Sequence, residues 1–415
     1  MHPPSLTPEH DTPPAGLPSR TARQGAATTL ADALQASRAD TLATFALYEQ
    51  ALPGLQIPYR EALNPPLWEL GHIGWFQDWW LARFSQRHLG LAADPDATRL
   101  PANRAAADAL YNSSRVPHAT RWALPLPDAQ ATRADLAQQL AQTLDLLAKV
   151  ASTDTGLYFH RLALHHEDMH HEAALYMAQA LGVAVPGTPW QAPRLPTPPP
   201  PLQWPAGPWR LGSEAGAGFA FDNELGAHPL VLPATAMDAQ AVRWAEFLPF
   251  VQDGGYAHPQ WWCEAGAAWR QQQATATPRY LRQDGAQWQQ WRHGQWRLLD
   301  LHEPACHLTH FEAQAWCRWA GRRLPTEAEW ERAAVTQPQA MRWGDVWEWT
   351  ASPFAPYPGF EAHPYRDYSA PWFDGRPVLR GASFMTQPRM KHPRYRNYFP
   401  AYRNDVPAGF RSCAI

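Results

Sequence analysis

The sequence lacks the features that place a protein in a membrane or on a nucleic acid. No apolar run approaches the roughly twenty residues that a bilayer-spanning helix requires. The formal net charge of -3 gives no electrostatic reason to expect nucleic acid or an anionic membrane as a partner. The stretch before residue 27 is rich in Pro, Thr and Ala and has no signal-peptide core. We therefore expect a cytoplasmic protein, and the sequence indicates no obligate protein partner.

Cysteine and charged residues are also scarce. The four cysteines form no CxxC pair and no zinc-ribbon spacing, so we expect buried or incidental thiols; they are Cys263, Cys306, Cys317 and Cys413. Only 18% of the residues are charged, whereas Trp (22) and Pro (43) are abundant. This composition indicates a loop-rich, aromatic-packed region beside a more regular one.

The regular region is helical. From Thr28 to about Leu181 apolar residues recur three and four positions apart, and proline is confined mostly to starts and connections. Four helices are predicted, near residues 29–52, after Pro65-Pro66, near 129–151 and near 157–181. We expect a disordered tail over residues 1–27 and a four-helix bundle over residues 28–185, a scaffold that builds metal sites from facing helices.

A different pattern follows the bundle. Prolines crowd residues 186–208, which we interpret as a linker. Residues 209–415 alternate short apolar or aromatic stretches with Gly, Pro and Asp turns, as is typical of an irregular α+β domain. Two short helices are still signalled there by capping boxes, Thr309 with Glu312 and Thr326 with Glu329.

A histidine-rich segment in the fourth helix is the strongest chemical signal. His166 and His170 are four residues apart and share a stripe with Leu162, Ala173 and Met177, so both imidazoles are expected on the buried face.

An alternative pair, Glu167 and His171, has the same spacing. A third imidazole, His72, shares the face of Trp68, Phe76 and Trp79 in the second helix. A core-facing histidine is often only a packing residue, and imidazole spacing does not choose among zinc, copper, iron and nickel. From the residues alone, a metal-binding bundle is one open interpretation.

These motifs resemble a known family. Residues 65–80 (PPLWELGHIGWFQDWW) and the pattern H-x3-H-x-E at His166, His170 and Glu172 resemble the DinB-like domain of ergothioneine-pathway sulfoxide synthases. The second half resembles their formylglycine-generating-enzyme-like domain, whose fold is related to the C-type lectins. The segments that carry this second resemblance are residues 221–224, 323–331, 345–350, 379–381 and 409–411.

The resemblance implies a mononuclear non-haem iron oxygenase. His72, His166 and His170 would hold Fe(II), dioxygen would be a co-substrate, and Glu172 would not be a ligand. The substrate would be hercynine, the trimethylated betaine of histidine, which the family couples at its imidazole carbon to a thiol.

Within the family, residues 64–80 and 112–118 resemble the selenoneine synthase branch, which uses a selenosugar as donor. Phe399 stands where members that use γ-glutamylcysteine carry an aspartate, which argues against that donor, whereas cysteine-using members also tend to be aromatic there. Together with the branch resemblance, this favours a selenosugar over cysteine or γ-glutamylcysteine. Met169 stands where some relatives place a glutamine near the ammonium group. Alternatives of other classes are a zinc-dependent DinB-like thiol transferase and a non-catalytic ligand-binding protein.

The resemblance also suggests substrate contacts, which would place the active site between the domains. Tyr398 and Arg403 fall where relatives contact substrate, and Arg115 and Arg121 lie in the long connection between helices. The candidate substrate-binding set is thus Tyr398, Phe399, Arg403, Arg115, Arg121 and Met169. The tyrosine proton donor of some relatives has three candidates here, Tyr357, Tyr365 and Tyr368. Trp347 and Trp349 are expected in the core of the second domain.

Overall fold

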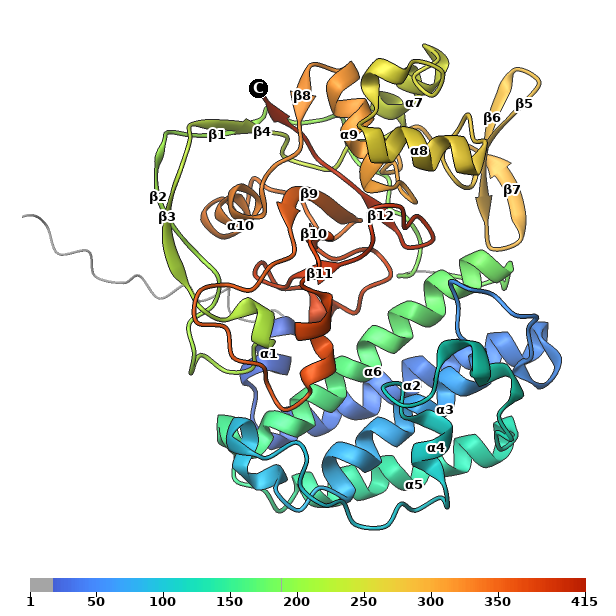
Figure 1. The fold of residues 1–415 in the computed structure, drawn as a ribbon, viewed down its shortest axis with the longest axis vertical. Helices are drawn as coiled ribbons and strands as arrows, with labels where there is room; N and C mark the ends of the chain where they lie inside the picture. The colour runs from blue at the N-terminus through green and yellow to red at the C-terminus, as the bar shows by residue number, and fades with distance from the viewer. Residues whose placement is uncertain (1–17, 188) are drawn as a thin grey trace, which may run out of the picture.

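Four long helices form the N-terminal domain, as predicted. The computed structural model describes residues 18–187 and 189–415. The long helices and the short helix in the long connection are α2 (Ala27–Ala51), α3 (Pro66–Gln77), α4 (Ala107–Tyr111), α5 (Ala129–Leu147) and α6 (Asp154–Leu181). A π-helical turn over Asp78–Ala82 extends α3. Figure 1 shows α6 lying along the boundary between this bundle and the second domain.

Local signals explain where α3 and α6 begin and end. Pro66 occupies the first turn of α3, where no backbone donor is lost. Helix α6 begins at Asp154, earlier than predicted, because the Thr153 hydroxyl accepts a hydrogen bond from the Gly156 amide. It ends at Leu181, and the capping residue Gly182 has a positive φ of 74°, the left-handed conformation that glycine adopts without strain.

The prediction of a disordered tail over residues 1–27 is wrong from residue 18 onward; the earlier part lies outside the described residues. Pro18–Gln24 form α1, which lies against the second domain. The Arg23 guanidinium is buried and donates two hydrogen bonds to the Glu224 carboxylate, at 2.7 and 2.9 Å. This ion pair joins segments 201 residues apart, so no local pattern could reveal it.

The linker prediction for residues 186–208 is also wrong at its C-terminal end. Strand β1 (Leu202–Trp204) pairs antiparallel with β4 (Thr235–Met237), and β2 (Gly207–Leu211) begins inside the proposed linker. The proline run 198–201 itself forms no helix or strand. A short strand next to prolines is defined by its ladder partner, which lies more than 30 residues away.

The second domain is a mixture of small sheets and short helices, as predicted for an α+β domain. Within the described residues, two four-stranded sheets have the orders β1-β4-β13-β8 and β11-β10-β9-β12. Strand β12 pairs parallel with β9, and the other pairings are antiparallel. A two-stranded ribbon β2-β3 and a three-stranded sheet β5-β6-β7 complete the strands.

The remaining bounds are β3 (His228–Leu232), β5 (Leu281–Asp284), β6 (Gln287–Arg292), β7 (Gln295–Leu298), β8 (Arg322–Arg323), β9 (Trp347–Pro353), β10 (Pro377–Arg380), β11 (Asn397–Tyr398), β12 (Ala408–Gly409), β13 (Cys413–Ala414), α7 (Trp244–Gln252), α8 (Glu264–Gln273), α9 (His310–Trp319) and α10 (Glu327–Thr336).

The two predicted capping boxes are confirmed at α9 and α10. In each, the threonine hydroxyl accepts from the glutamate amide three residues later, and the glutamate carboxylate accepts from the threonine amide. All four cysteines are free, and three of them are buried.

The apolar core does not stop at the domain boundary. One continuous cluster contains Phe76, Trp80 and Phe159 of the bundle together with Trp347 and Trp349 of the second domain. In the part of the chain that the structure describes, no helix combines the length and apolar character needed to cross a bilayer. The shared core holds the two domains against each other along α6.

Candidate metal centre

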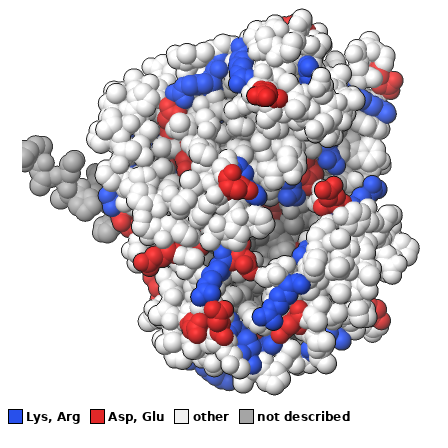
Figure 2. Space-filling model, viewed as in Figure 1, with Lys and Arg blue, Asp and Glu red and all other residues white. Residues whose placement is uncertain are grey.

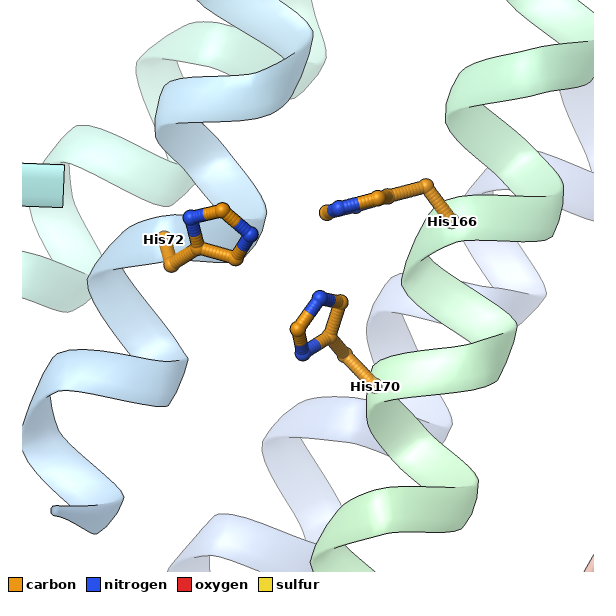
Figure 3. Close-up of side chains that lie close together, drawn as sticks. All are labelled: His72, His166 and His170. Atoms are coloured by element: carbon orange, nitrogen blue, oxygen red, sulfur yellow. The ribbon is translucent and has the colours of Figure 1, made fainter. Parts of the chain in front are cut away.

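Three histidines from two facing helices converge on one point. His72 projects from α3, and His166 and His170 project from α6, so that the ring nitrogens meet in the space between the helices (Figure 3). One ligand atom from each residue lies within 4.8 Å of the others. The ring centroids are 5.1 Å apart for His72 and His166 and 4.4 Å apart for His166 and His170. These are the three residues that the sequence proposed as ligands.

Two of the three imidazoles have partners that fix which nitrogen is available. Nδ1 of His72 lies 2.8 Å from the Tyr111 carbonyl oxygen, so Nδ1–H donates and Nε2 is left free. Nδ1 of His170 lies 2.5 Å from Oε2 of Glu69. A carboxylate or carbonyl behind a ligating imidazole is the usual support of a metal-binding histidine.

The third imidazole provides the test of whether a metal fits. Both ring nitrogens of His166 are buried, and neither has a hydrogen-bond partner. The ring stacks on Phe76 with centroids 3.5 Å apart and planes within 7°. A buried polar group without a partner is costly, and a metal ion at the convergence point would satisfy one of these nitrogens.

The electrostatics favour neutral imidazoles, the form that binds metals. Burial and the neighbouring His170 lower the pKa of His72 to about 3, and burial holds the pKa of His166 well below its usual range. Burial opposes ionisation of Glu69, but His170, His72 and Asn64 outweigh it and lower the pKa of this carboxyl to about 2. The site therefore holds the Glu69 carboxylate beside two imidazoles, His72 and His166, that are neutral at neutral pH.

A cavity of about 660 Å³ opens at His166 and His170 between the two domains. Figure 2 shows a hollow along this boundary, with side chains of both charges at its rim. The bundle contributes Met169, Ala173 and Tyr176 to its wall. The wall from the second domain is mostly aromatic. Its aromatic members are Trp347, Tyr365, Tyr368, Trp372, Tyr395, Tyr398 and Phe399, and Asp367, Pro371, Asn397 and Val406 complete it.

Most of the predicted substrate residues meet at this cavity. Met169, Arg121, Tyr398 and Phe399 line it, as do two of the candidate proton donors, Tyr365 and Tyr368. The Tyr365 ring lies 6.2 Å from the His166 ring, centroid to centroid.

Three other candidates lie elsewhere. Tyr357 is buried, and its hydroxyl donates to Glu327 at 3.1 Å. Arg403 is not on the cavity wall; its guanidinium pairs with Asp405 at 2.7 Å and lies over the Phe399 ring, from which it can support the wall. Arg115 is exposed and does not line the cavity.

Several residues at the site were missed by sequence reasoning. Tyr395 lines the cavity, and Glu69 supports His170 from α3. The spacing from Glu69 to His72 was a possible signal, since residues three apart share a helical face. Trp347 is buried in the core as expected, but it also reaches the cavity wall.

A short segment of the second domain, residues 383–390, docks on the other side of α6. The Glu172 carboxylate accepts hydrogen bonds from Trp347 Nε1, Ser383 Oγ and Thr386 Oγ1, at 2.7 to 3.0 Å. Arg389 donates two hydrogen bonds of 2.7 Å to Asp168. Glu172 is thus an interdomain anchor, which agrees with the expectation that it is not a ligand.

The alternative pair is engaged in structural contacts. Glu167 is buried and pairs with Arg38 at 2.7 Å. His171 lies 2.9 Å from the Thr44 hydroxyl and 3.2 Å from the Gln387 amide. Both point away from the three converging imidazoles, so the pair offers no competing metal site.

Comparison with known proteins decides the family. Hercynine oxygenase of Mycolicibacterium smegmatis is 32% identical to this chain, over 92% of the chain and 98% of the relative. Hercynine oxygenase of Mycobacterium tuberculosis is 31% identical, over 85% and 91% respectively. This chain belongs to the hercynine oxygenase family.

The same comparisons confirm the second domain. Residues 188–344 match the family model of the sulfatase-modifying factor enzyme 1-like domain. Formylglycine-generating enzyme of Streptomyces coelicolor is 30% identical over 35% of this chain and 50% of its own length. The family and the fold class inferred from the motifs are therefore confirmed, and so is the assignment as an enzyme. The hercynine oxygenase relatives do not distinguish a selenoneine synthase branch.

Proposed function

We propose that this hercynine oxygenase family member is an iron(II)- and dioxygen-dependent enzyme that joins a chalcogen donor to the imidazole carbon of hercynine. The observation that carries the proposal is the convergence of His72, His166 and His170 within 4.8 Å at the mouth of an interdomain cavity. Three imidazole ligands would leave coordination positions for reactants. Bound iron(II) would activate dioxygen and act as a template for the two substrates.

The residues of the chain prepare the site for a betaine. A trimethylammonium group cannot donate hydrogen bonds, and it is attracted to the faces of aromatic rings. Tyr365, Tyr368, Tyr395 and Trp372 supply such faces on the cavity wall. Because these rings come from the second domain and the ligands come from the bundle, only the intact interface can hold hercynine against the metal.

A tyrosine hydroxyl near the reacting atoms would supply a proton. We propose Tyr365 for this role because it lines the cavity and its ring also contacts Phe76, at 5.0 Å, beside the His166 ring. Burial raises the pKa of Tyr365, so its hydroxyl keeps its proton at neutral pH.

We further propose a selenosugar as the chalcogen donor. An amino-acid donor brings a carboxylate and an ammonium group, which need charged partners when buried. Among the described residues that line the cavity, Arg121 is the only Arg or Lys, and it already donates to Asn64 and to the Val116 carbonyl. Aromatic faces with neutral polar neighbours such as Asn397 and Ser113 suit a sugar better.

The test is an aerobic assay of the iron-loaded chain with hercynine and each of three donors, a selenosugar, cysteine and γ-glutamylcysteine, read by mass spectrometry of the product. We expect the highest kcat/KM with the selenosugar. An equal or higher value for either thiol would overturn the donor and keep the oxygenase. Thiol transfer with zinc in the absence of dioxygen would overturn the oxygenase itself and favour a DinB-like transferase.

A further inference from the structure

The three imidazoles have different neighbours. Only His170 bonds to a carboxylate, and that carboxylate is itself held by further hydrogen bonds. His72 bonds to the neutral carbonyl of Tyr111, and His166 stacks on the Phe76 ring. His170, in contrast, bonds to the Glu69 carboxylate. Glu69 is almost completely buried, with 3% of its surface exposed. A buried charge of this kind is stable only if other groups satisfy it.

The second carboxylate oxygen of Glu69, Oε1, accepts a hydrogen bond from outside the three histidines. The Asn64 amide donates to Oε1 of Glu69, and the Arg121 guanidinium donates to Oδ1 of Asn64 at 2.6 Å. The donors run in one direction, from the Arg121 cation through the Asn64 amide to the Glu69 anion, which also accepts from His170. Each group in this chain lines the same cavity.

Arg121 also packs on Trp68, which in turn stacks on His72. Its guanidinium lies 3.9 Å from the centre of the Trp68 ring, and Trp68 stacks on His72 with centroids 4.7 Å apart and planes within 12°. The Trp68 indole is held in turn by a 2.7 Å hydrogen bond to the Leu110 carbonyl. Arg121 therefore occupies a defined position, although it lies in a 3₁₀ turn (His118–Ala123) of the long connection.

We propose that Arg121, Asn64 and Glu69 form a positioning relay that sets the orientation and the donor strength of His170. The inference rests on the proposed metal centre. Glu69 fixes His170 with Nε2 facing the metal, and its negative charge strengthens that nitrogen as a donor. Asn64 and Arg121 hold the carboxylate in place and make its burial tolerable. None of the three is a ligand, so each acts through His170.

Metal affinity of the full-length chain tests the relay without use of turnover. The probe is Co(II), titrated anaerobically against a competing chelator. Glu69→Gln retains the shape of the side chain and removes its charge, and we expect Co(II) affinity to fall roughly 10- to 100-fold. Asn64→Ala and Arg121→Ala should lower the affinity in the same direction and by less, whereas Arg121→Lys should recover part of the loss.

The double variant separates a relay from three independent effects. If Arg121 acts through Glu69, then Glu69→Gln with Arg121→Ala should bind Co(II) no more weakly than Glu69→Gln alone. Arg133→Ala is the matched control, because it removes another arginine–carboxylate pair of the bundle, with Glu49, that does not contact the histidines. The control should bind Co(II) like the wild-type chain.

Other results of the Co(II) titration would overturn either the relay alone or the metal centre as well. Wild-type affinity in Glu69→Gln, or fully additive losses in the double variant, would overturn the relay and leave the proposed function intact. A wild-type chain that binds no Co(II) would overturn the metal centre and the relay with it. Thermal unfolding of each variant distinguishes an unfolded chain from a folded one with a weakened site.

Discussion

At the scale of single residues, burial alone does not make a histidine a ligand. His160 and His166 lie on the same helix, and both are buried. Only His166 converges with His72 and His170 on a shared point. His160 and His166 therefore differ in the direction in which their rings point, and replacing each of them tests whether this direction decides metal binding.

We predict that His166→Ala abolishes turnover and lowers iron affinity by more than the roughly 100-fold that loss of an outer-shell partner can reach. The reason is the loss of one of three nitrogen ligands. His72→Ala and His170→Ala should behave alike, whereas His160→Ala should retain iron. Elemental analysis of the purified chains gives the iron content, and full iron occupancy in the three ligand variants would contradict the assignment.

A second residue-scale prediction concerns the tyrosines. Tyr365→Phe should lower kcat by roughly 10²-fold or more, the range of a lost general acid, because the ring remains and only the hydroxyl is lost. Tyr357→Phe is the control, since its hydroxyl bonds to Glu327 away from the cavity. The measurement is kcat under saturating hercynine and donor. Equal rates in the wild type and in Tyr365→Phe would transfer the role to Tyr368, the other candidate on the wall.

At the scale of elements, α6 performs three tasks on three faces. His166 and His170 face the proposed metal site, Met169 and Ala173 face the cavity, and Asp168 and Glu172 bond to the second domain. The period of 3.6 residues separates these faces, and this is why an eight-residue segment could carry so much information.

The same reasoning explains what the sequence could and could not predict. The helices, the capping boxes and the shared helical face of His166 and His170 depend on contacts within one or two turns, and these predictions agree with the structure. Strand β1, helix α1 and the cavity residue Tyr395 depend on partners far along the chain, and they were missed. Local patterns report local contacts, whereas the interface between domains is formed by long-range contacts.

The two capping boxes should respond to pH in opposite ways. Burial raises the pKa of Glu312 in α9 to about 7. Burial opposes ionisation of Glu329 in α10 as well, but there Arg323 and the Thr326 amide outweigh it, and the pKa is lowered. A raised carboxyl pKa means that the folded chain binds more protons than the unfolded chain, and a lowered one means the reverse.

We therefore predict that Glu312 destabilises the fold progressively as pH rises from 4.5 to about 7, by on the order of 3 kcal/mol. Glu312→Gln should remove this slope. Glu329 contributes stability above its unfolded pKa of about 4.5 that is lost as pH falls through the lower folded value, so Glu329→Gln should be destabilising mainly at neutral pH. Urea unfolding at pH 3, pH 5 and pH 8 measures both, because the Glu329 contribution changes below about pH 4.5 and that of Glu312 changes between pH 4.5 and about 7. Parallel pH profiles for the two variants would contradict the assignment.

At the scale of the whole molecule, the proposed active site depends on the strength of the contacts between the second domain and α6. Two of the ion pairs that cross the boundary have very different surroundings. Arg389 pairs with Asp168, whose side chain is fully buried, at 2.7 Å. Arg366 pairs with Asp96 at 2.9 Å, and the two side chains remain 56% and 76% exposed.

These two pairs give the last prediction. Arg389→Ala leaves the Asp168 carboxylate buried with only the Ser37 hydroxyl as a partner, at 2.6 Å, and should lower the free energy of unfolding by about 3–5 kcal/mol. Arg366→Ala removes a solvated pair and should cost about 0–1 kcal/mol.

Because Asp168 lies between His166 and His170 on α6, the loss at Arg389 should also weaken Co(II) binding, whereas Arg366→Ala should not. Urea unfolding and Co(II) titration of both variants test this. Equal free energies of unfolding for the two variants would mean that the contact of residues 383–390 with α6 contributes little stability. A destabilised Arg389→Ala chain with wild-type Co(II) affinity would mean that this contact does not position the histidines.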